Sequence, residues 1–308
     1  MVADDVAVPN PGAGEVRFRV EAAGLNFIDT YQRSGLYSVK LPHTLGMEAA
    51  GVVTALGAGV TELALGDRVA SVRTVGAYAQ EATAPAAHTV KLPAGISMQV
   101  AAALMLQGMT AQYLACDTFP LKSGDTALVH AGAGGVGLLL TQIAKLRGAR
   151  VLATVGTVEK AVLAREAGAD EVCIYTLENF TDAVKVFTGG RGVDVAYDAI
   201  GKDTFDGTLA SLRPRGMFVS YGNSSGPVAP FAPLVLSQKG SLFFTRPTLA
   251  HYTLTTSELH ARAAKLFSWV TAGKLKVRIG ATFPLEQAAE AHRALEGRKT
   301  TGKVLLVP

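Results

Sequence analysis

The chain has 308 residues, enough for two domains of ordinary size, and 49% of them are apolar, which predicts well-buried cores. Its net charge of +4 is dispersed, without a block of lysines and arginines, so a nucleic-acid surface is not expected. Two cysteines, Cys116 and Cys173, exclude a disulfide framework, and no apolar run approaches membrane-spanning length. Free thiols are typical of reducing compartments, so we expect a soluble, cytoplasmic protein.

Residues 1–107 are expected to form an all-β unit. Short apolar runs alternate with polar residues at a spacing of two, as in EVRFRVEAAG at residues 15–24 and EAAGVVTALG at residues 48–57. Gly and Pro residues separate these runs about every ten positions, as they do between the strands of antiparallel sheets.

The pattern changes at residue 98, where MQVAAALMLQGMTAQYLA has the length and composition of a helix. Four strand-like runs then alternate with helix-like runs, beginning with TALVHA before GLLLTQIAKLRG and RVLATV before EKAVLAREAG, and two further strand-like runs, GMFVSYG and GSLFFTRP, follow. Residues 108–249 are therefore predicted to form an α/β domain with an open, doubly wound parallel sheet. Residues 250–308 follow with two expected helices, 255–272 and 285–297, and a closing strand, GKVLLVP.

A glycine-rich turn joins the first strand of the α/β domain to its helix in the stretch HAGAGGVGLLLTQIAK. The glycines Gly132, Gly134 and Gly137 follow the GxGxxG pattern, which permits a tight turn, close approach of a pyrophosphate and close packing of helix on strand. Backbone N–H groups at Gly134, Gly135 and Val136 would then hold the anion. The turn predicts a dinucleotide site, although methyltransferases that bind S-adenosylmethionine also use a glycine-rich turn of this kind.

The end of the next strand distinguishes the two nicotinamide dinucleotides. An NAD site places an acid about 20 residues beyond the glycines, where it binds the ribose hydroxyls. This chain has VLATVGTVEK there, with Gly156 in the turn and no acid before Glu159. Lys160 would neutralise a 2′-phosphate, or it is an ordinary solvated helix lysine. The two observations together favour NADP(H).

Many short stretches of the chain resemble one family. They include AAGLNFIDTYQRSGLY, GMEAAGVV, GDRVA, AGAGGVG, YDAIG, YGNSSG, GSLFFTRP and GKVLLVP. On these the chain resembles the zinc-independent medium-chain dehydrogenases/reductases, most closely the NADPH-dependent quinone oxidoreductases of the zeta-crystallin type. The resemblance implies a GroES-like catalytic domain, a Rossmann domain that binds NADPH in the cleft between the two, and a C-terminal return to the catalytic domain. It also implies a homodimer, paired through GSLFFTRP as an apolar edge strand.

The resemblance assigns candidate residues in the first domain. Tyr37 and Asn26 would donate hydrogen bonds to the substrate oxygen as it gains charge, and Tyr31 would line the nicotinamide ribose. A turn-capping role for Asn26 and a core position for Tyr31 are the alternatives. Thr110 and Tyr113 would begin the helix that enters the cofactor domain, where Tyr113 either packs on the cofactor or fills the domain junction.

Other candidates come from the cofactor domain and the C-terminal segment. Tyr175, at the end of the third strand, would approach the 2′-phosphate beside Gly156 and Lys160. The segment Phe243 to Pro247, with Phe244 and Arg246, would follow the sixth strand and supply backbone for the nicotinamide carboxamide. The loop after the fifth strand and the C-terminal turn supply Tyr221, Gly222, Asn223, Ser224 and Arg298. For Arg246 a salt bridge, and for Arg298 an exposed loop position, are the alternatives.

The resemblance also bears on metal binding. Zinc alcohol dehydrogenases carry Cys, His and Cys where this chain has Asn26, Met47 and Gln107, and amides and a thioether are poor Zn²⁺ ligands. No metal is therefore expected, and Glu48 is the one cleft carboxylate, with a structural role favoured. Three functions stay open: a quinone reductase, an NADPH-dependent 2-alkenal or enone reductase, and a non-catalytic NADPH-binding protein with a structural or RNA-contacting role.

Overall fold

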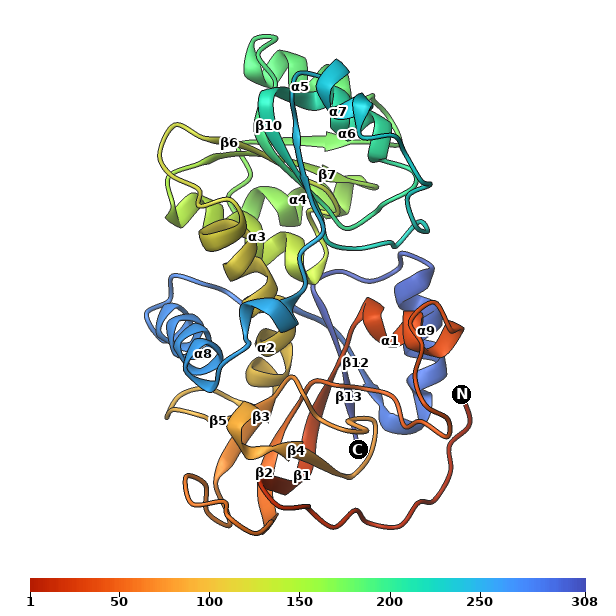
Figure 1. Cartoon of the computed structure of the whole chain (residues 1–308), viewed down its shortest axis with the longest axis vertical. Helices are drawn as coiled ribbons and strands as arrows, with labels where there is room; N and C mark the ends of the chain where they lie inside the picture. Colours follow the sequence, from red (N-terminus) through yellow and green to blue (C-terminus); the bar gives the residue numbers. More distant parts are fainter. The chain divides into compact units, whose positions relative to one another are not determined.

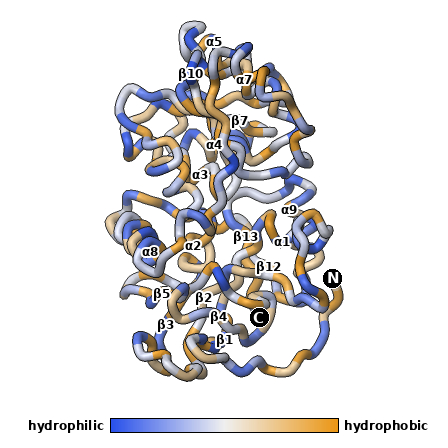
Figure 2. Tube along the Cα trace, in the orientation of Figure 1, coloured by the Kyte–Doolittle hydropathy of each residue, from blue (hydrophilic) through white to orange (hydrophobic).

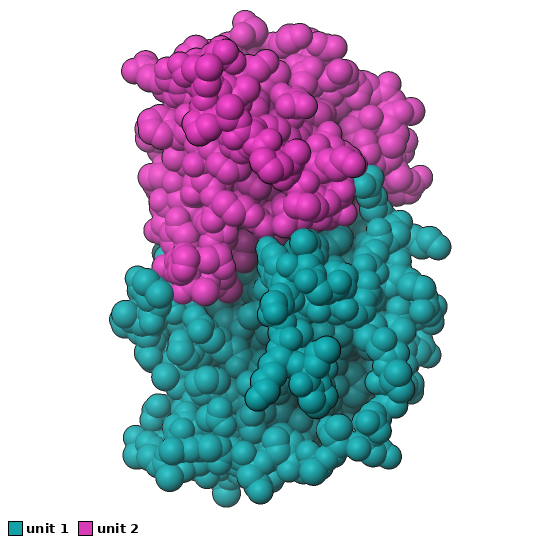
Figure 3. Space-filling view, turned by 45° about the vertical axis from the view of Figure 1, so that its right-hand side comes forward, with its two compact units in different colours: residues 1–109, 253–308 teal, residues 110–252 magenta.

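The structure is a computed structural model that describes residues 1–308, and it divides into two compact units (Figures 1 and 3). Unit 1 consists of residues 1–109 and 253–308, and unit 2 consists of residues 110–252. The boundaries expected from the sequence, 107 and 249, lie within two or three residues of this division. The chain therefore leaves unit 1, forms unit 2 from one continuous segment, and returns.

Unit 1 is built on a seven-stranded sheet that contains residues from both ends of the chain. In spatial order the strands are β12 (Ile279–Pro284), β13 (Lys303–Val307), β1 (Glu15–Leu25), β2 (Ala49–Leu56), β3 (Arg68–Ser71) and β5 (Thr89–Lys91), with β4 (Glu81–Pro85) also paired to β1. Alternate residues of β1, namely Val16, Phe18 and Val20, are buried in the core. This spacing of two is the one that predicted the strand.

The helices of unit 1 include one that the sequence analysis did not predict. They are α1 (Phe27–Ser34), α2 (Met98–Tyr113), which runs on into unit 2, α8 (Thr256–Thr271) and α9 (Ala288–Glu296). The all-β expectation was wrong for α1, whose first turn is held by a bond from the backbone N–H of Asn26 to the Asp29 carboxylate at 2.8 Å. Gly35 ends that helix in the left-handed region, with φ of 81°.

The helix α8, expected at residues 255–272, is amphipathic. Figure 2 shows hydrophilic and hydrophobic residues interspersed along it. Its buried residues Leu259, Ala263 and Leu266 recur every three or four positions, which places them on one face.

Unit 2 is a six-stranded parallel sheet, and it confirms the predicted doubly wound α/β fold. In spatial order its strands are β11 (Phe243–Thr245), β10 (Leu212–Ser220), β9 (Val193–Asp198), β6 (Thr126–Val129), β7 (Arg150–Val155) and β8 (Glu171–Ile174). The intervening helices are α3 (Gly135–Leu146), α4 (Val158–Glu166), α5 (Phe180–Thr188), α6 (Phe205–Ser211) and α7 (Leu234–Gln238). Every residue of β6 and β9 is buried, as expected for the central strands of a parallel sheet covered on both faces.

Two placements from the sequence analysis need correction. Phe244 lies within β11 instead of following the sixth strand, because its ring packs into an aromatic cluster with Phe205, Phe218 and Phe231. Thr110 and Tyr113 lie in the last turns of α2 and do not begin a helix, because that helix starts at Met98 and continues without a break across the unit boundary.

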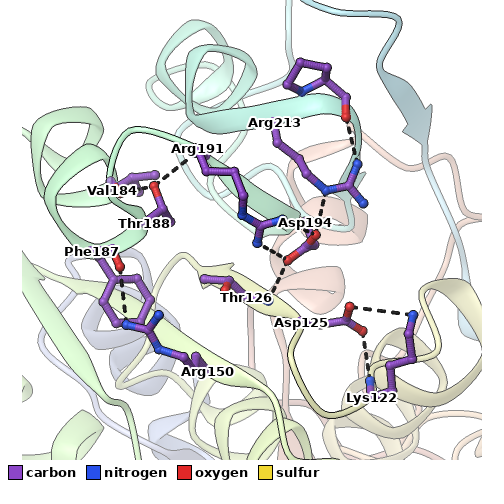
Figure 4. A network of polar contacts seen from close by, with 12 residues as sticks. Lys122, Asp125, Thr126, Arg150, Val184, Phe187, Thr188, Arg191, Asp194 and Arg213 are labelled. Carbon is purple, nitrogen blue, oxygen red and sulfur yellow. Dashed lines mark hydrogen bonds and ion pairs between the residues drawn. The ribbon is translucent and has the colours of Figure 1, made fainter.

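A carboxylate joins the amino-terminal ends of three strands in unit 2 (Figure 4). Asp194 accepts the backbone N–H of Thr126 at 2.8 Å, Arg191 Nη2 at 2.7 Å and Arg213 Nε at 2.6 Å. Burial by itself would raise the pKa of Asp194, but the hydrogen bonds from Arg191 and Arg213 outweigh it and lower the pKa from 3.8 to about 2. The two guanidinium groups therefore favour the charged carboxylate that holds β6, β9 and β10 together.

We predict that Asp194→Asn lowers the free energy of unfolding by about 1.5–3 kcal/mol, the usual value of hydrogen bonds to a charged group. Because the folded pKa lies below the unfolded one, the contribution of Asp194 is present above pH 3.8 and is lost as the pH falls toward about 2. Urea unfolding at several pH values measures both effects. The control Asp182→Asn removes an exposed ion pair with Lys185 and should change stability by less than about 0.5 kcal/mol. Equal losses for the two variants would contradict the role given to Asp194.

Candidate cofactor and substrate site

The glycine-rich turn of unit 2 has the geometry of an anion site. Gly134 is the N-cap of α3, with an extended backbone, and its N–H donates to the carbonyl of Ala131 at 2.9 Å. This N–H is therefore already engaged and is not free to hold an anion, contrary to the expectation from the sequence. Gly135 and Val136 are the first residues of the helix, where backbone N–H groups have no preceding helical carbonyl to bind. A side chain on Gly137 would overlap the Ala131 carbonyl oxygen, so only glycine lets helix and turn approach this closely.

A buried histidine fixes the strand ends on either side of this turn. His130 follows β6 directly, and its ring nitrogens bond the hydroxyls of Thr154, in β7, at 2.9 Å and of Thr208, in α6, at 3.0 Å. Burial lowers the pKa of His130 below 6.5, against the opposing effect of Asp198, so the ring is neutral. The Thr154 carbonyl in turn accepts the N–H of Gly132 at 2.9 Å. The turn is therefore bonded to β7 through Gly132, and His130, which precedes it, is bonded to both β7 and α6.

The end of β7 shows why no acid stands there. A Cβ on Gly156 would lie 2.7 Å from the hydroxyl oxygen of Tyr175, which follows β8 and is 42% exposed. Tyr175 therefore lies over Gly156 and leaves no space for a carboxylate. Lys160 is in the first turn of α4, the helix that follows Gly156. Its backbone N–H donates to the capping hydroxyl of Thr157 at 3.3 Å. The structure brings together Gly156 and Tyr175, and Lys160 follows Gly156 by four positions in the chain.

The loops after β10 and β11 are joined to each other at the carboxyl end of the same sheet. Arg246 Nη1 donates to the carbonyl of Ser220 at 3.0 Å, and its Nη2 donates to the carboxamide oxygen of Asn223 at 3.2 Å once that amide is oriented to satisfy both its groups. Arg246 thus bonds a backbone carbonyl and a side-chain amide. Backbone N–H groups of Tyr221 and Ser224 bond the carbonyls of Asp198 and Ala199. Ligands of open α/β sheets bind at this end of the strands.

Two sequence candidates of unit 2 lie in its interior. Tyr113 is 2% exposed and stacks on Tyr252, with ring centroids 4.2 Å apart and planes 9° from parallel. Thr110 is buried as well. One face of the Tyr113 ring is thus covered by protein, and contact of either residue with a cofactor stays a prediction.

Of three further candidates of unit 1, two are exposed and one is buried. Tyr37 is 37% exposed, and its ring packs against Tyr31 in an edge-to-face arrangement, with ring centroids 5.2 Å apart. Tyr31 is buried in α1, which agrees with the core alternative given for it. Arg298 is exposed in the turn after α9, with a left-handed backbone at φ of 57°.

Asn26 belongs to a buried cluster of charged and amide side chains in unit 1. Its amide nitrogen donates to the Gly24 carbonyl at 3.0 Å and to Glu48 Oε2 at 2.8 Å. Its amide oxygen accepts Lys303 Nζ at 2.8 Å and Gln107 Nε2 at 3.2 Å. All four hydrogen-bonding positions of the carboxamide are thus filled, and a bond from Asn26 to a substrate would require one of these to break.

Lys303 and Glu48 form the ion pair at the centre of this cluster. The side chains are 1% and 0% exposed, and Nζ lies 2.5 Å from Oε2. Glu48 Oε1 accepts the backbone N–H of Leu106, inside α2, at 2.6 Å. The sequence analysis noted Glu48 but missed Lys303, although a lysine in the apolar strand GKVLLVP is an available signal.

A second series of hydrogen-bonded side chains also contacts α1. Arg33 can only donate, so it fixes His292 as the acceptor at Nδ1, at 3.1 Å. His292 Nε2 then donates to the Tyr78 hydroxyl at 3.1 Å, and Tyr78 donates to Asp29 at 2.9 Å. Burial, followed by the charge of Arg33, lowers the pKa of His292 to about 4, while burial raises the pKa of Asp29 to about 7. No sequence motif indicated this series.

The positions compared with zinc ligands hold no metal-binding group in this structure. Asn26 and Gln107 bond each other, Asn26 also bonds Lys303, and no cluster of three or more His, Cys, Asp or Glu side chains is arranged to hold an ion. No helix has the length and apolar character needed to cross a membrane.

A doubly wound parallel sheet with a glycine-rich turn, formed by a segment inserted in a β-rich unit, is typical of two-unit nucleotide-dependent oxidoreductases. Comparisons with known proteins agree with this class. Residues 12–118 match the alcohol dehydrogenase GroES-like domain, and residues 167–306 match the family described as zinc-binding dehydrogenase.

Comparison with individual proteins shows which members of this class of oxidoreductase the chain is similar to. A quinone oxidoreductase of Pseudomonas aeruginosa is 47% identical over 306 residues, which are 99% of this chain and 94% of that protein. A 2-haloacrylate reductase of a Burkholderia species is 44% identical, with 99% and 94% of the two chains covered. The structure of Escherichia coli quinone oxidoreductase complexed with NADPH matches with a TM-score of 0.97 at 43% identity, over 99% of this chain and 95% of that one. The chain belongs to the quinone oxidoreductase family of medium-chain dehydrogenases/reductases, which confirms the resemblance seen in its sequence.

Proposed function

We propose that this protein is an NADPH-dependent quinone oxidoreductase. The assignment of NADPH as the cofactor rests on the end of β7. There Tyr175 lies over Gly156, no acid is present, and Lys160 follows in α4. Similarity over nearly the full length to quinone oxidoreductases supports the reaction. The substrate is a small molecule.

The residues of the chain would bind and orient the two reactants. When bound, NADPH supplies a hydride, which the quinone accepts together with a proton to give the hydroquinone. The N–H groups of Gly135 and Val136 would hold the pyrophosphate, and Tyr175 and Lys160 would bind the 2′-phosphate. The loop after β10, residues 221–224, and the segment 244–246 would hold the nicotinamide half of the cofactor.

A second reaction has a specific observation in its favour. The 2-haloacrylate reductase is almost as similar to this chain as the quinone oxidoreductases, and by its name it acts on an activated alkene. Reduction of 2-alkenals or enones is therefore the alternative. A panel of quinones and enones, assayed with NADPH and with identification of products, distinguishes the two. Absence of turnover with the whole panel would instead favour the non-catalytic NADPH-binding role.

We predict that Lys160→Glu weakens NADPH binding by about tenfold or more, because one charge-assisted phosphate contact is worth about 1.5–3 kcal/mol. NADH has no 2′-phosphate, so its affinity should change little. Fluorescence titration with both cofactors measures the two dissociation constants. Lys239→Glu makes the same charge change at an exposed position of unit 2 and should affect neither. An unmodified protein that binds both cofactors equally would refute the assignment.

We predict that Tyr37→Phe lowers kcat for a quinone several-fold and leaves NADPH affinity nearly unchanged. The hydroxyl would stabilise charge on the substrate oxygen, and a quinone needs this less than the substrate of a hydrolase, where such a donor is worth roughly 2.7–4 kcal/mol. Steady-state kinetics with several acceptors measure the effect. Unaltered kcat with all of them would leave Tyr37 as a wall of the pocket. Asn26 is the second proposed donor, subject to the release of one of its present bonds.

The exposed edge of unit 2 supports a homodimer. β11 is the last strand of its sheet, and Phe243 in it is 58% exposed. An unpaired apolar edge favours pairing with a second copy of the chain. Light scattering at micromolar concentration tests this, and a monomer would count against it.

Two further expectations belong to this proposal. Amide and thioether groups at Asn26, Met47 and Gln107 support an enzyme that works without zinc, which elemental analysis and assay after chelation test. The two free cysteines, Cys116 and Cys173, support a location in the cytoplasm, which fractionation of the cell tests.

A further inference from the structure

One buried acceptor in the Asn26 cluster has no hydrogen-bond partner within the protein. It is the side-chain oxygen, Oε1, of Gln107 in α2. The Gln107 side chain as a whole is half-buried, and its Nε2 is bonded to Asn26. Buried polar atoms in folded proteins are nearly always paired, so an unpaired one needs an explanation.

The orientation of this amide follows from the charges that surround its neighbour. Lys303 can only donate and the Glu48 carboxylate can only accept, so together they fix which end of the Asn26 carboxamide faces each. The Asn26 oxygen that faces Lys303 also accepts Gln107 Nε2, and Gln107 therefore directs Oε1 away from the cluster. Reversal of the Gln107 amide would place two oxygens against each other.

The ion pair holds this arrangement without room for adjustment. A Cβ on Gly24 would meet Ala102 and the ends of both Glu48 and Lys303, so the backbone of β1 lies directly against the pair. Glu48 also bonds the N–H of Leu106, the residue before Gln107. The pair thus fixes both the side chain and the backbone that present Oε1.

We propose that Gln107 Oε1 accepts a hydrogen bond from an O–H or N–H group of a bound reactant, and that Lys303 is the positioning residue that orients it. The donor is either a hydroxyl of the hydroquinone or the carboxamide N–H of the nicotinamide of NADPH. This inference rests on the proposed function for the identity of the reactants. It gives Gln107, not assigned to the site from the sequence, a direct contact.

The test measures binding, so it does not depend on turnover. Gln107→Met keeps the length of the side chain and removes its polar atoms. Dissociation constants are measured by calorimetry for NADPH, for 2′-phospho-ADP-ribose, which lacks the nicotinamide, and for benzene-1,4-diol. We expect either NADPH or the diol to bind about threefold to tenfold more weakly, the effect of one neutral hydrogen bond, with 2′-phospho-ADP-ribose unchanged. Whichever ligand is weakened identifies the donor.

The positioning role has its own variant. Lys303→Met alone would leave Glu48 buried without its counter-charge and is expected to destabilise unit 1, so the double variant Lys303→Met/Glu48→Gln removes both charges together. It should weaken the same ligand as Gln107→Met, and the triple variant should show no further loss, because all act through one atom. Gln80→Met, at an exposed glutamine of unit 1, is the control and should change none of the constants.

Three results would overturn the inference. They are unchanged binding of all ligands by Gln107→Met, equal weakening of 2′-phospho-ADP-ribose, and full affinity in the double variant. A protein that binds these ligands as expected but reduces no quinone would refute the proposed reaction and leave the role of Gln107 standing.

Discussion

The ion pair between Lys303 and Glu48 determines much of unit 1. Taking two charges out of water is costly, and it is offset only where further hydrogen bonds satisfy both groups. Here the ammonium also bonds Asn26, and the carboxylate also bonds Asn26 and the backbone of Leu106. One pair therefore joins β13, the start of α1 and the middle of α2, and it sets the direction of every amide that contacts it.

Unit 2 uses the same means at both ends of its sheet. Asp194 joins strands at their amino ends, while at the carboxyl ends His130 joins β6, β7 and α6 beneath the glycine-rich turn. In each case a single buried polar side chain joins three segments of the unit, its own segment included. The loops that would hold a cofactor thus start from strand ends that cannot move independently.

Much of the fold could be predicted from the sequence because its signals are local. The runs of β6 and β9 are apolar for most of their length, as strands covered on both faces tend to be, and the GxGxxG turn stands between strand and helix. The short helix α1 escaped notice because its first turn is held by Asn26 and Asp29 instead of by an apolar pattern.

The polar cluster could not be predicted, since its members are far apart in the chain and meet only through the sheet of unit 1. Glu48 and Lys303 are separated by 255 positions, and they meet because β1 pairs with β2, which follows Glu48, as well as with β13, which begins at Lys303. Composition and residue spacing do not predict a contact between residues so far apart in the sequence. The resemblance placed Asn26 and Gln107 at the positions of zinc ligands, but only the structure shows which of their atoms are already engaged.

The discontinuous course of unit 1 has a consequence for synthesis on the ribosome. Unit 2 is one continuous segment, so all its residues have been synthesised once position 252 has emerged. The sheet of unit 1 is complete only when β13, its last strand in the sequence, has been synthesised. Until then the nascent protein carries Glu48 without its cation, and residues 23–25 of β1 lack the partner strand that β13 later supplies. The segment from Lys303 onward thus completes a unit that began with the first strand, and a chain released before that codon would lack the charge on which its amide network depends.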